Sequence, residues 1–388
     1  MYTKVRVKDV AEINPSKPTN FKELSPDFKV SFFPMSSVSE NGKIVTPEVR
    51  SLGEVNKGYT YFEENDILLA KITPCMENGK RAIAKNLVNG TGFGSTEFHV
   101  LRPKQAMLST YLFHIIGSDI FRKEAKANMT GSAGQKRVPA SFVKEYSIPL
   151  PSLETQKKIA DVLDKSQELI DKRKSQIEKL DEFVQSVFFD MFGDPISQQK
   201  WNVEAVGNAC KCIVPGRDKP KSFSGNIPWI TTDDLKLNGV TEKSKKYLGL
   251  NENEIKNVKA KIIPKGSVLM SCVGNLGITS IAGVDLVINQ QLHSFQCGDR
   301  IDNRFLCYLL SLNVPYMKKM ATETTVLYMN KTVCNSIPII VPPLELQRKF
   351  ALVVEQTEQQ KSLMQQSLAE MENNFNSIMQ RAFRGELF

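Results

Sequence analysis

The sequence is poor in the residues from which most metal sites and catalytic triads are built. Its 388 residues include only three histidines and two tryptophans, and its seven cysteines follow no regular spacing. Irregularly spaced cysteines argue against a disulfide framework and for reduced thiols. No apolar run approaches the length needed to span a bilayer, and neither end has the pattern of a signal peptide, so we expect a cytoplasmic protein.

The sequence also lacks the motifs of common nucleotide-binding and DNA-modifying enzymes. The glycine pairs at 92–94 and 274–277 complete neither a GxGxxG nor a P-loop pattern, so we interpret both as turns. There is no Asp/Asn-Pro-Pro-aromatic tetrapeptide of the adenine methyltransferase kind, and no nuclease carboxylate cluster that ends in lysine. Cys210 and Cys212 have no second pair at zinc spacing. We therefore predict no catalytic, cofactor-binding or metal site in this chain.

The sequence does contain a long uninterrupted helical pattern between residues 152 and 192. Its apolar positions recur in alternating steps of four and three, which is the heptad seam of a coiled coil. Pro151 precedes the pattern, and Gly193 and Pro195 follow it, as expected at the two ends of a helix. The predicted seam comprises Ile159, Leu163, Ser166, Ile170, Arg173, Ile177, Leu180, Val184, Val187 and Met191.

This pattern occurs twice, because residues 342–383 repeat residues 151–192 without a gap. Identical residues in the two copies include Leu153 and Leu344 near the start, and Phe192 and Phe383 at the end. Such agreement in one register indicates an internal duplication. The second predicted seam comprises Phe350, Val354, Thr357, Lys361, Met364, Leu368, Met371, Phe375, Ile378 and Ala382.

We therefore predict an α+β protein with a pseudo-twofold internal repeat. Two similar globular domains (1–150 and 195–341) are each expected to precede a long helix (151–194 and 342–388). A helix of this length spans about 60 Å at roughly 1.5 Å per residue. It carries the chain from the first domain to the second, so the second helix must run back if it packs along the first. Connectivity thus predicts an antiparallel coiled coil that joins the two domains.

The net charge of +9 is distributed unevenly along the chain. Residues 1–150 contain 21 Lys/Arg and 15 Asp/Glu (net +6), and residues 195–341 contain 18 and 11 (net +7). The helical segments contain 7 against 10 (net −3) and 5 against 6 (net −1). A DNA-binding helix of the bZIP type would itself be basic, so that class is excluded. Two basic globular domains are typical of modules that each bind a polyanion.

Polar loops of the two domains supply the candidate DNA contacts. Asn and Gln pair with adenine edges, Arg and Lys pair with guanine, and Lys commonly holds phosphate. His99 and His293 occupy similar places in the two halves, and we interpret both as structural histidines on strands. The candidate DNA-binding residues are Lys71, Lys80, Arg81, Gln135, Lys136, Arg137, Arg217, Lys219, Lys221, Asn289, Gln290, Gln291 and Lys331.

The chain resembles the specificity subunit of type I restriction–modification enzymes. The resemblance covers its whole length and depends on the repeated helix starts, IPLPSLETQKKIADVLD and IVPPLELQRKFALVVEQ. It depends also on the helix ends SVFFDMFGD and SIMQRAFRGELF, and on the segments GSAGQKRV and INQQLHSF. The doubled order of variable domain and helix is distinctive of that family.

The resemblance implies that the globular parts are target-recognition domains, each of which recognises one half of a split double-stranded DNA site. The helices would space the domains and bind two modification (methyltransferase) subunits, and restriction subunits with translocase and nuclease activity would join the complex. S-adenosylmethionine, ATP and Mg²⁺ would be used by those partners, and no cofactor by this chain, which would not be catalytic by itself. Predicted docking residues at the helix starts are Glu154, Gln156, Glu345 and Gln347.

Three other functions stay open at this point. The chain could be the recognition subunit of a type IIB-like system, which differs only in its partners. A self-contained DNA methyltransferase or restriction enzyme is disfavoured by the absence of catalytic motifs. A coiled-coil adaptor that binds no DNA is disfavoured by the positive charge of the two domains.

Overall fold

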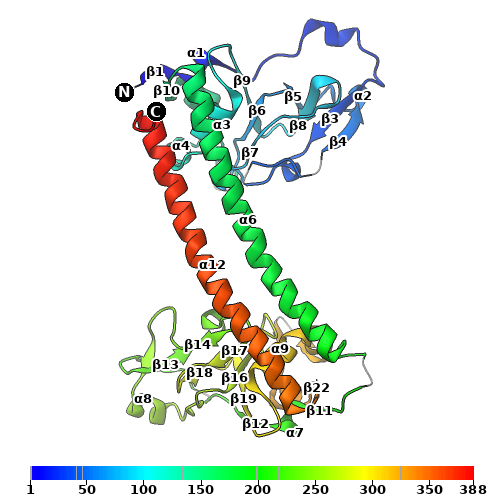
Figure 1. Cartoon of the computed structure of the whole chain (residues 1–388), viewed down its shortest axis with the longest axis vertical. Coiled ribbons are helices and arrows are strands. Elements are labelled where there is room, and N and C mark those ends of the chain that lie inside the picture. The colour runs from blue at the N-terminus through cyan, green and yellow to red at the C-terminus, as the bar shows by residue number, and fades with distance from the viewer. Residues whose placement is uncertain are drawn as a thin grey trace. The chain divides into compact units, whose positions relative to one another are not determined.

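The computed structural model describes residues 2–40, 42–45, 47–132, 134–197, 200–216, 218–323 and 326–388. The chain divides into two compact units: Met1–Arg173 with Ser367–Phe388 forms unit 1, and Lys174–Gln366 forms unit 2. Each unit contains one β-rich domain and part of two long helices, α6 (Leu153–Phe192) and α12 (Leu344–Arg384) (Figure 1). The predicted α+β class, with two β-rich domains and two long helices packed together, is confirmed.

The domain of unit 1 is built mainly from strands. These are β1 (Thr3–Arg6), β2 (Ala11–Ile13), β3 (Lys29–Phe33), β4 (Glu48–Ser51), β5 (Thr60–Glu63), β6 (Ile67–Ala70), β7 (Arg81–Ile83), β8 (Thr91–Gly94), β9 (Phe98–Pro103) and β10 (Ser147–Leu150). One antiparallel sheet has the order β2-β9-β6-β7, and a second has the order β4-β3-β8-β5 with β3 and β8 parallel. A separate pair, β1 and β10, joins the start of the chain to the strand that precedes α6.

Strand β8 corrects one interpretation of the sequence. The glycine pair at 92–94 lies in this buried strand, so the turn interpretation is wrong. A Cβ at Gly92 would lie 2.0 Å from the ring of Phe62, and one at Gly94 would lie 2.5 Å from the carbonyl oxygen of Phe33. The glycines therefore serve close packing of β8 against its neighbours. Gly274 and Gly277, which have φ of +73° and +76°, do lie in a turn.

Helices cover the first sheet of unit 1 and form its main core together with both long helices. The short helices are α1 (Val7–Val10), α2 (Leu52–Val55), α3 (Ser109–Gly117), α4 (Asp119–Ala127) and α5 (Ala140–Glu145). The core cluster around α3 and α4 includes Ile159 and Leu163 from α6 and Met379 and Ala382 from α12. The first turns of α6 and the last turns of α12 therefore pack side by side on the same domain.

The domain of unit 2 has a similar strand plan. Its strands are β11 (Val203–Ala205), β12 (Cys210–Ile213), β13 (Ile227–Ile230), β14 (Val240–Thr241), β15 (Gly249–Leu250), β16 (Val268–Ser271), β17 (Thr279–Ala282), β18 (Val287–Ile288), β19 (Leu292–Cys297), β20 (Thr322–Glu323), β21 (Leu327–Tyr328) and β22 (Pro338–Ile340). The order β12-β19-β16-β17-β14 repeats the unit 1 order β2-β9-β6-β7 and adds β14. A second sheet has the order β15-β13-β18, and the pair β11–β22 corresponds to β1–β10.

The core of unit 2 likewise includes both long helices. Its short helices are α7 (Val206–Ala209), α8 (Glu252–Asn257), α9 (Asn303–Leu312), α10 (Val314–Met320) and α11 (Lys331–Asn335). The main core cluster contains Val184 and Phe188 from α6 and Phe350 and Val354 from α12. The four short 3₁₀ helices of the described residues are Thr19–Lys22, Met35–Ser37, Val88–Gly90 and Thr232–Asp234.

The predicted seams describe the buried sides of the two long helices. Every seam residue of both copies is buried or half-buried, and none is exposed. Within unit 2, Lys361 Nζ lies 2.6 Å from Asp181 Oδ1, so these two positions of the long helices lie opposite one another. The seam is apolar where the helix ends join the domain cores and more polar between, where Ser166, Arg173 and Lys361 lie half-buried and Thr357 is buried.

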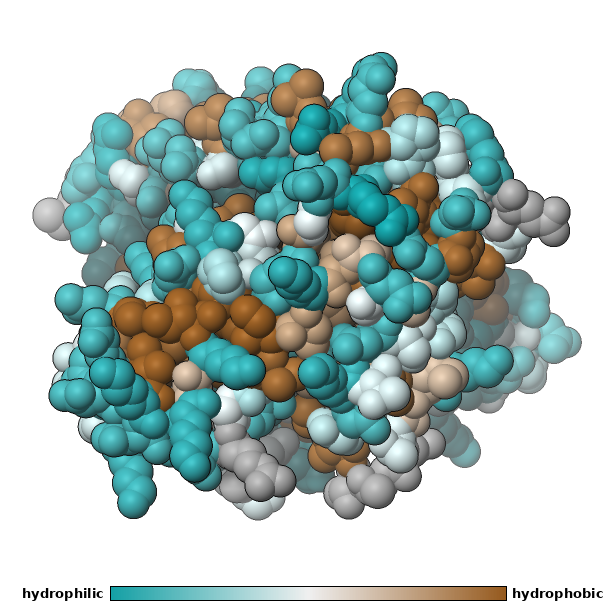
Figure 2. All heavy atoms as spheres, turned by 90° about the horizontal axis from the view of Figure 1, so that it is seen from below, coloured by the Kyte–Doolittle hydropathy of each residue, from teal (hydrophilic) through white to brown (hydrophobic). Residues whose placement is uncertain are grey.

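The face in Figure 2 is mostly hydrophilic, with apolar side chains gathered in patches. Tyr247 is 81% exposed and Leu237 is 61% exposed in unit 2. None of the described helices is both long and apolar enough to span a membrane.

A buried glutamine fixes the start of each long helix. Gln156 accepts a hydrogen bond from the backbone N–H of Leu108 (2.9 Å) and donates to the carbonyl oxygens of Ala106 (2.9 Å) and Pro151 (3.0 Å). Both Gln156 and Gln347 are fully buried. Gln347 makes the same three bonds in unit 2, with the N–H of Asp302 (2.9 Å) and the carbonyl oxygens of Arg300 (3.0 Å) and Pro342 (2.8 Å). Each amide thereby ties a helix start to the loop before α3 or α9.

We predict that Gln156→Leu and Gln347→Leu each lower the free energy of unfolding by about 2–5 kcal/mol. The leucine leaves three part-buried backbone groups without their amide partner. A group that stays unpaired and buried costs roughly 1–3 kcal/mol, and water can reach some of these groups, so the expected loss is below the full sum. Chemical denaturation of the chain, with hydrogen exchange to locate the loss in unit 1 or unit 2, measures the effect. Gln359→Leu makes the same change at an exposed position of α12 and should stay within about 0.5 kcal/mol of the parent. An unchanged denaturation midpoint for both buried variants would contradict the anchoring role.

Candidate nucleic-acid interface

Four of the predicted DNA-binding residues of unit 1 come together at the end of β6. The N–H of Val138 donates to the carbonyl oxygen of Lys71 (2.9 Å), and the N–H of Thr73 donates to that of Lys136 (2.9 Å). Ile72 and Arg137 form a β-bridge between these two bonds. The basic loop therefore adds a short edge segment to the sheet. It brings Gln135, Lys136 and Arg137 beside Lys71, more than 60 residues away in the chain.

Glu97, which we did not predict, completes this cluster. Its carboxylate accepts two hydrogen bonds from Arg137, from Nε (2.9 Å) and from Nη2 (2.8 Å). The Arg137 side chain is 42% exposed, so the pair faces solvent at the sheet edge. The guanidinium lowers the pKa of the Glu97 carboxyl, which stays ionised. Glu97 is fixed in turn by the backbone, since its carbonyl oxygen accepts from the N–H of Lys71 (2.9 Å).

The two remaining candidates of unit 1 differ in character. Lys80 lies beside the cluster, because its carbonyl oxygen accepts from the N–H of Ala70 at the end of β6 (3.0 Å). Arg81 points instead toward α3, where Nε donates to the carbonyl oxygen of Phe113 (3.0 Å) and the guanidinium stacks on the Phe113 ring at 4.3 Å. Burial lowers the pKa of Arg81 to about 10. Its bonds serve packing, so we withdraw Arg81 from the candidate DNA contacts.

Unit 2 repeats the three backbone hydrogen bonds and the β-bridge of this cluster with different side chains. We call these four backbone interactions the frame. The N–H of Cys272 donates to the carbonyl oxygen of Gln291 (2.8 Å), as Lys71 does to Glu97. The N–H of Met329 donates to Cys272 (2.9 Å), that of Gly274 donates to Leu327 (2.8 Å), and Val273 forms a β-bridge with Tyr328. All four backbone interactions thus recur. Cys272, Gln291, Leu327 and Tyr328 occupy the positions of Lys71, Glu97, Lys136 and Arg137.

The predicted amide cluster of unit 2 lies in this frame. Asn289 Nδ2 donates to Gln291 Oε1 (3.0 Å), and the N–H of Gln291 donates to Asn289 Oδ1 (3.1 Å). Gln290 and Gln291 are exposed, and Asn289 is half-buried. Tyr328, whose residue is 46% exposed, lies on the facing edge segment. The structure therefore places an amide pair and an aromatic ring where unit 1 has a carboxylate and a guanidinium.

The other candidates of unit 2 lie apart from the amide cluster or next to its edge segment. Lys219 and Lys221 are exposed and border a hollow of about 630 Å³ beside Glu254 of α8. Lys331 is exposed at the start of α11, two residues beyond the frame residue Met329. Arg217 lies outside the described residues. The DNA-contact role of all the exposed candidates stays a prediction.

The two histidines on strands, His99 and His293, are buried and make structural contacts. His99 Nε2 bonds with the carbonyl oxygen of Val138 (2.8 Å), and its Nδ1 lies 3.2 Å from Asn14 Nδ2. His99 thus fastens the edge segment to β9. Burial lowers its pKa, so the ring stays neutral.

His293 lies beside a thiol and an amide. Its Nε2 lies 2.9 Å from Cys212 Sγ and 3.2 Å from Asn335 Oδ1. A Cys-His-Asn triad needs the two ring nitrogens to serve different partners, whereas here one nitrogen meets both. Burial also raises the pKa of the Cys212 thiol, which disfavours the nucleophilic thiolate. This group therefore does not have the geometry of a nucleophilic site.

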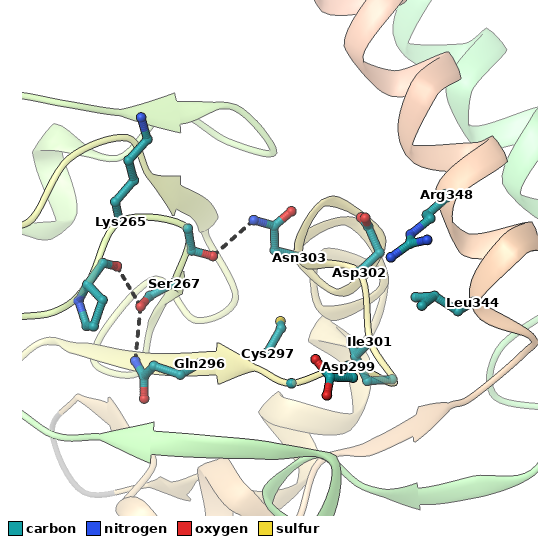
Figure 3. A pocket seen from close by; sticks show the side chains of 13 residues that line it. Lys265, Ser267, Gln296, Cys297, Asp299, Ile301, Asp302, Asn303, Leu344 and Arg348 are labelled. Atoms are coloured by element: carbon teal, nitrogen blue, oxygen red, sulfur yellow. Dashed lines mark hydrogen bonds between the residues drawn. The ribbon is translucent and has the colours of Figure 1, made fainter.

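A buried ion pair of unit 1 is replaced in unit 2 by two uncharged side chains that border a hollow. In unit 1 the buried Asp66 accepts two bonds from Arg102 (2.9 and 2.7 Å). The equivalent residues of unit 2 are Ser267 and Gln296, joined by one bond of 3.2 Å. Ser267 and Gln296 line a hollow of about 500 Å³, together with residues at the starts of α9 and α12. Figure 3 shows that acidic and basic side chains from several elements surround it, among them Asp302 and Arg348.

The predicted docking residues divide into two classes. Glu154 and Glu345 are exposed, and each pairs with a lysine four residues later, Lys158 (2.7 Å) and Lys349 (3.1 Å). Their side chains are 78% and 81% exposed. Gln156 and Gln347 are fully buried and offer no surface to a partner. We therefore restrict the docking prediction to the two glutamates. Among the described residues, no group of three His, Cys, Asp or Glu side chains could hold a metal ion.

The family of the chain is shown by a family model, "Type I restriction modification DNA specificity domain". It matches residues 1–180 and 199–373, one match for each half of the internal repeat. The chain belongs to this family.

Individual relatives agree with this assignment, and a solved structure has a similar fold. The chain is 40% identical over 174 residues to the EcoEI specificity subunit and 43% identical over 153 residues to the EcoAI specificity subunit, both type I restriction enzyme subunits of Escherichia coli. These matches cover 44% and 39% of this chain but only 29% and 25% of the two relatives. A solved structure described as "Structural basis underlying complex assembly and conformational transition of the type I R-M system" has a similar fold. Its TM-score is 0.63 at 23% identity, covering 100% of this chain and 98% of that chain.

We predict that His293 makes unit 2 less stable as the pH falls from about 6.5 toward 4. Burial lowers the pKa of folded His293 to about 4, whereas an unfolded histidine has a pKa of about 6.5. The unfolded chain therefore binds the proton first, and up to about 3 kcal/mol of stability is lost across this window. His293→Gln should remove that part of the pH dependence. Denaturation of both proteins between pH 8 and 4 measures it, and parallel curves would refute the assignment.

Proposed function

We propose that the chain is the DNA-recognition subunit of a type I restriction–modification complex, and that each domain recognises one half of a bipartite site. One observation carries this proposal: the same backbone frame occurs in both units and presents different side chains at an exposed sheet edge. A repeated frame with divergent edge residues suits two modules that bind similar shapes with different sequences. The net positive charge of residues 1–150 and 195–341 supports contact with the phosphate backbone in both halves.

The partners follow from the helices. We propose that the exposed sides of α6 and α12, with Glu154 and Glu345 near their starts, bind two modification subunits. The two helix starts are alike in sequence and in the hydrogen bonds of their glutamines, so they suit two copies of one partner. S-adenosylmethionine, ATP and Mg²⁺ would be used by the modification and restriction subunits of the complex.

An exchange of one domain tests the proposal. Replacing residues 195–341 with the matching segment of a relative should change one half of the target and leave the other intact. The segment contains both strands of the β11–β22 pair, so the exchange keeps this pairing within one piece. The measurement is the mapping of methylated adenines in cells that express the complex. The reciprocal exchange of residues 1–150 should change the other half, and an alteration of both halves by either exchange would oppose independent recognition.

A change in helix length tests whether the helices set the spacing of the half-sites. Deletion of residues 167–173 and 368–374 removes one heptad from each helix at facing positions, given the register of the Lys361–Asp181 pair. Each helix then shortens by about 10 Å, which corresponds to roughly three base pairs of DNA.

The expected result is a shorter spacer between two unchanged half-sites, read from the methylation pattern. Weaker activity is also expected, because the deletion rotates the bound half-sites relative to one another. Two control variants each carry the seven-residue deletion in only one of the helices, which should disrupt the pairing of the two seams. An active complex that keeps its original spacer would leave the helices a docking role alone.

A further inference from the structure

We propose that one pair of side chains in each unit determines which base pair is recognised at one position of each half-site. In unit 1 the pair is Glu97 with Arg137, and it recognises G·C. In unit 2 the pair is Gln291 with Tyr328, and it recognises A·T. The inference rests on the proposed function, to which it adds the deciding residues and their bases.

The two pairs are equivalent by backbone position. Residues 97 and 291 each accept a backbone bond from the residue after the central strand, Lys71 or Cys272. Residues 137 and 328 each form the bridge of the added edge segment. Each pair therefore consists of one residue before β9 or β19 and one residue on the edge segment, held by the same backbone bonds.

The hydrogen bonds of Arg137 leave a pattern that fits guanine. A guanidinium has five N–H donors, and three are used: Nε and one Nη2 hydrogen on Glu97, and one Nη1 hydrogen on the carbonyl oxygen of Gln135 (3.1 Å). One donor remains on each of Nη1 and Nη2. Two donors on neighbouring nitrogens suit a bidentate contact with O6 and N7 of guanine in the major groove. The Glu97 carboxylate keeps lone pairs that can accept from N4 of the paired cytosine.

The hydrogen bonds of Gln291 leave a pattern that fits adenine. Its Oε1 accepts one bond from Asn289 and retains a second lone pair. Its Nε2 carries two donors, so one acceptor and one donor can meet N6 and N7 of adenine. Tyr328 supplies an exposed ring on the facing segment, which suits contact with the methyl group of the paired thymine. Asn289 thus positions Gln291 as Glu97 positions Arg137.

The flanking residues argue that these pairs bind base edges and not phosphate. In unit 1, Lys71 and Lys136 flank the pair and supply charge for phosphate contacts. In unit 2 the equivalent residues are Cys272 and Leu327, which carry no charge. An exposed pair with hydrogen-bonding groups is retained in both units although the cations are not. The property shared by these positions is therefore recognition of a base pair.

Binding of the complex, formed with the modification subunits, to a set of duplexes tests the proposal. Each duplex carries one base-pair substitution in the bipartite site of the parent. The parent should discriminate at one G·C of the first half-site by about 5- to 140-fold, as a bidentate contact does. Arg137→Gln should abolish discrimination at this position only, and Glu97→Gln should weaken it there. Lys144→Gln removes the same charge at an exposed position of α5 in the same domain and should leave every preference unchanged.

Unit 2 provides the reciprocal test. Gln291→Glu or Tyr328→Ala should relax one A·T position of the second half-site. The double change Gln291→Glu with Tyr328→Arg, which places the unit 1 pair in the unit 2 frame, should convert that position to a preference for G·C.

Two results overturn the inference. Unchanged discrimination in Arg137→Gln and Gln291→Glu shows that other residues choose the base. Equal weakening on every duplex, with a smaller salt dependence, shows a phosphate contact. Failure of the proposed function gives a different result, because the parent complex would then bind all duplexes alike. Thermal unfolding of each variant verifies its fold, and the exposed position of Arg137 and Tyr328 favours folded variants.

Discussion

The structure depends on the burial of both long helices in the core of each domain. Ile159 and Leu163 of α6 share a core cluster with Met379 and Ala382 of α12, and unit 2 repeats this arrangement with the opposite ends of the helices. Neither domain can therefore bury its apolar surface with its own residues alone. Since burial of apolar surface is the main favourable term in folding, each domain and the helix ends beneath it must fold together. The end of the chain is thus part of the first domain, as the bond from Tyr2 Oη to the carbonyl oxygen of Phe388 (3.1 Å) also shows.

The residues that repeat between the two halves are those that hold this arrangement. Gln156 and Gln347 are fully buried and make the same three bonds, so an apolar residue at either position would leave backbone groups without these partners. Farther from the helices, the two units share fewer side chains at equivalent positions. The buried Asp66–Arg102 pair of unit 1 becomes Ser267 and Gln296 in unit 2, and the frame persists. At the sheet edge only backbone bonds repeat, so the side chains there are free to differ.

The same distinction explains what could be predicted from the sequence. The helices and their seams were predictable because a heptad period is a local signal, and the buried positions followed it. The strand β8 was missed because its glycines are required by the ring of Phe62, a contact that no local pattern reports. Arg81 was chosen for its charge, but its partner Phe113 lies on α3. Glu97 and Tyr328 were missed because their role depends on backbone pairing between distant segments. Alignment of His99 with His293 would have brought Glu97 into register with Gln291.

The exposed edge side chains of each unit can change without loss of the backbone bonds that hold the edge in place. The edge segment of each unit is fastened to its own domain: His99 Nε2 holds Val138 in unit 1, and the N–H of Met329 bonds to Cys272 in unit 2. These bonds involve backbone atoms, so substitution of an exposed edge side chain leaves them in place. Each edge also lies over a separate core, and changes that share no contacts add independently. A substitution at the edge of one unit should therefore leave the edge of the other unit and the hydrogen bonds of both helix starts undisturbed.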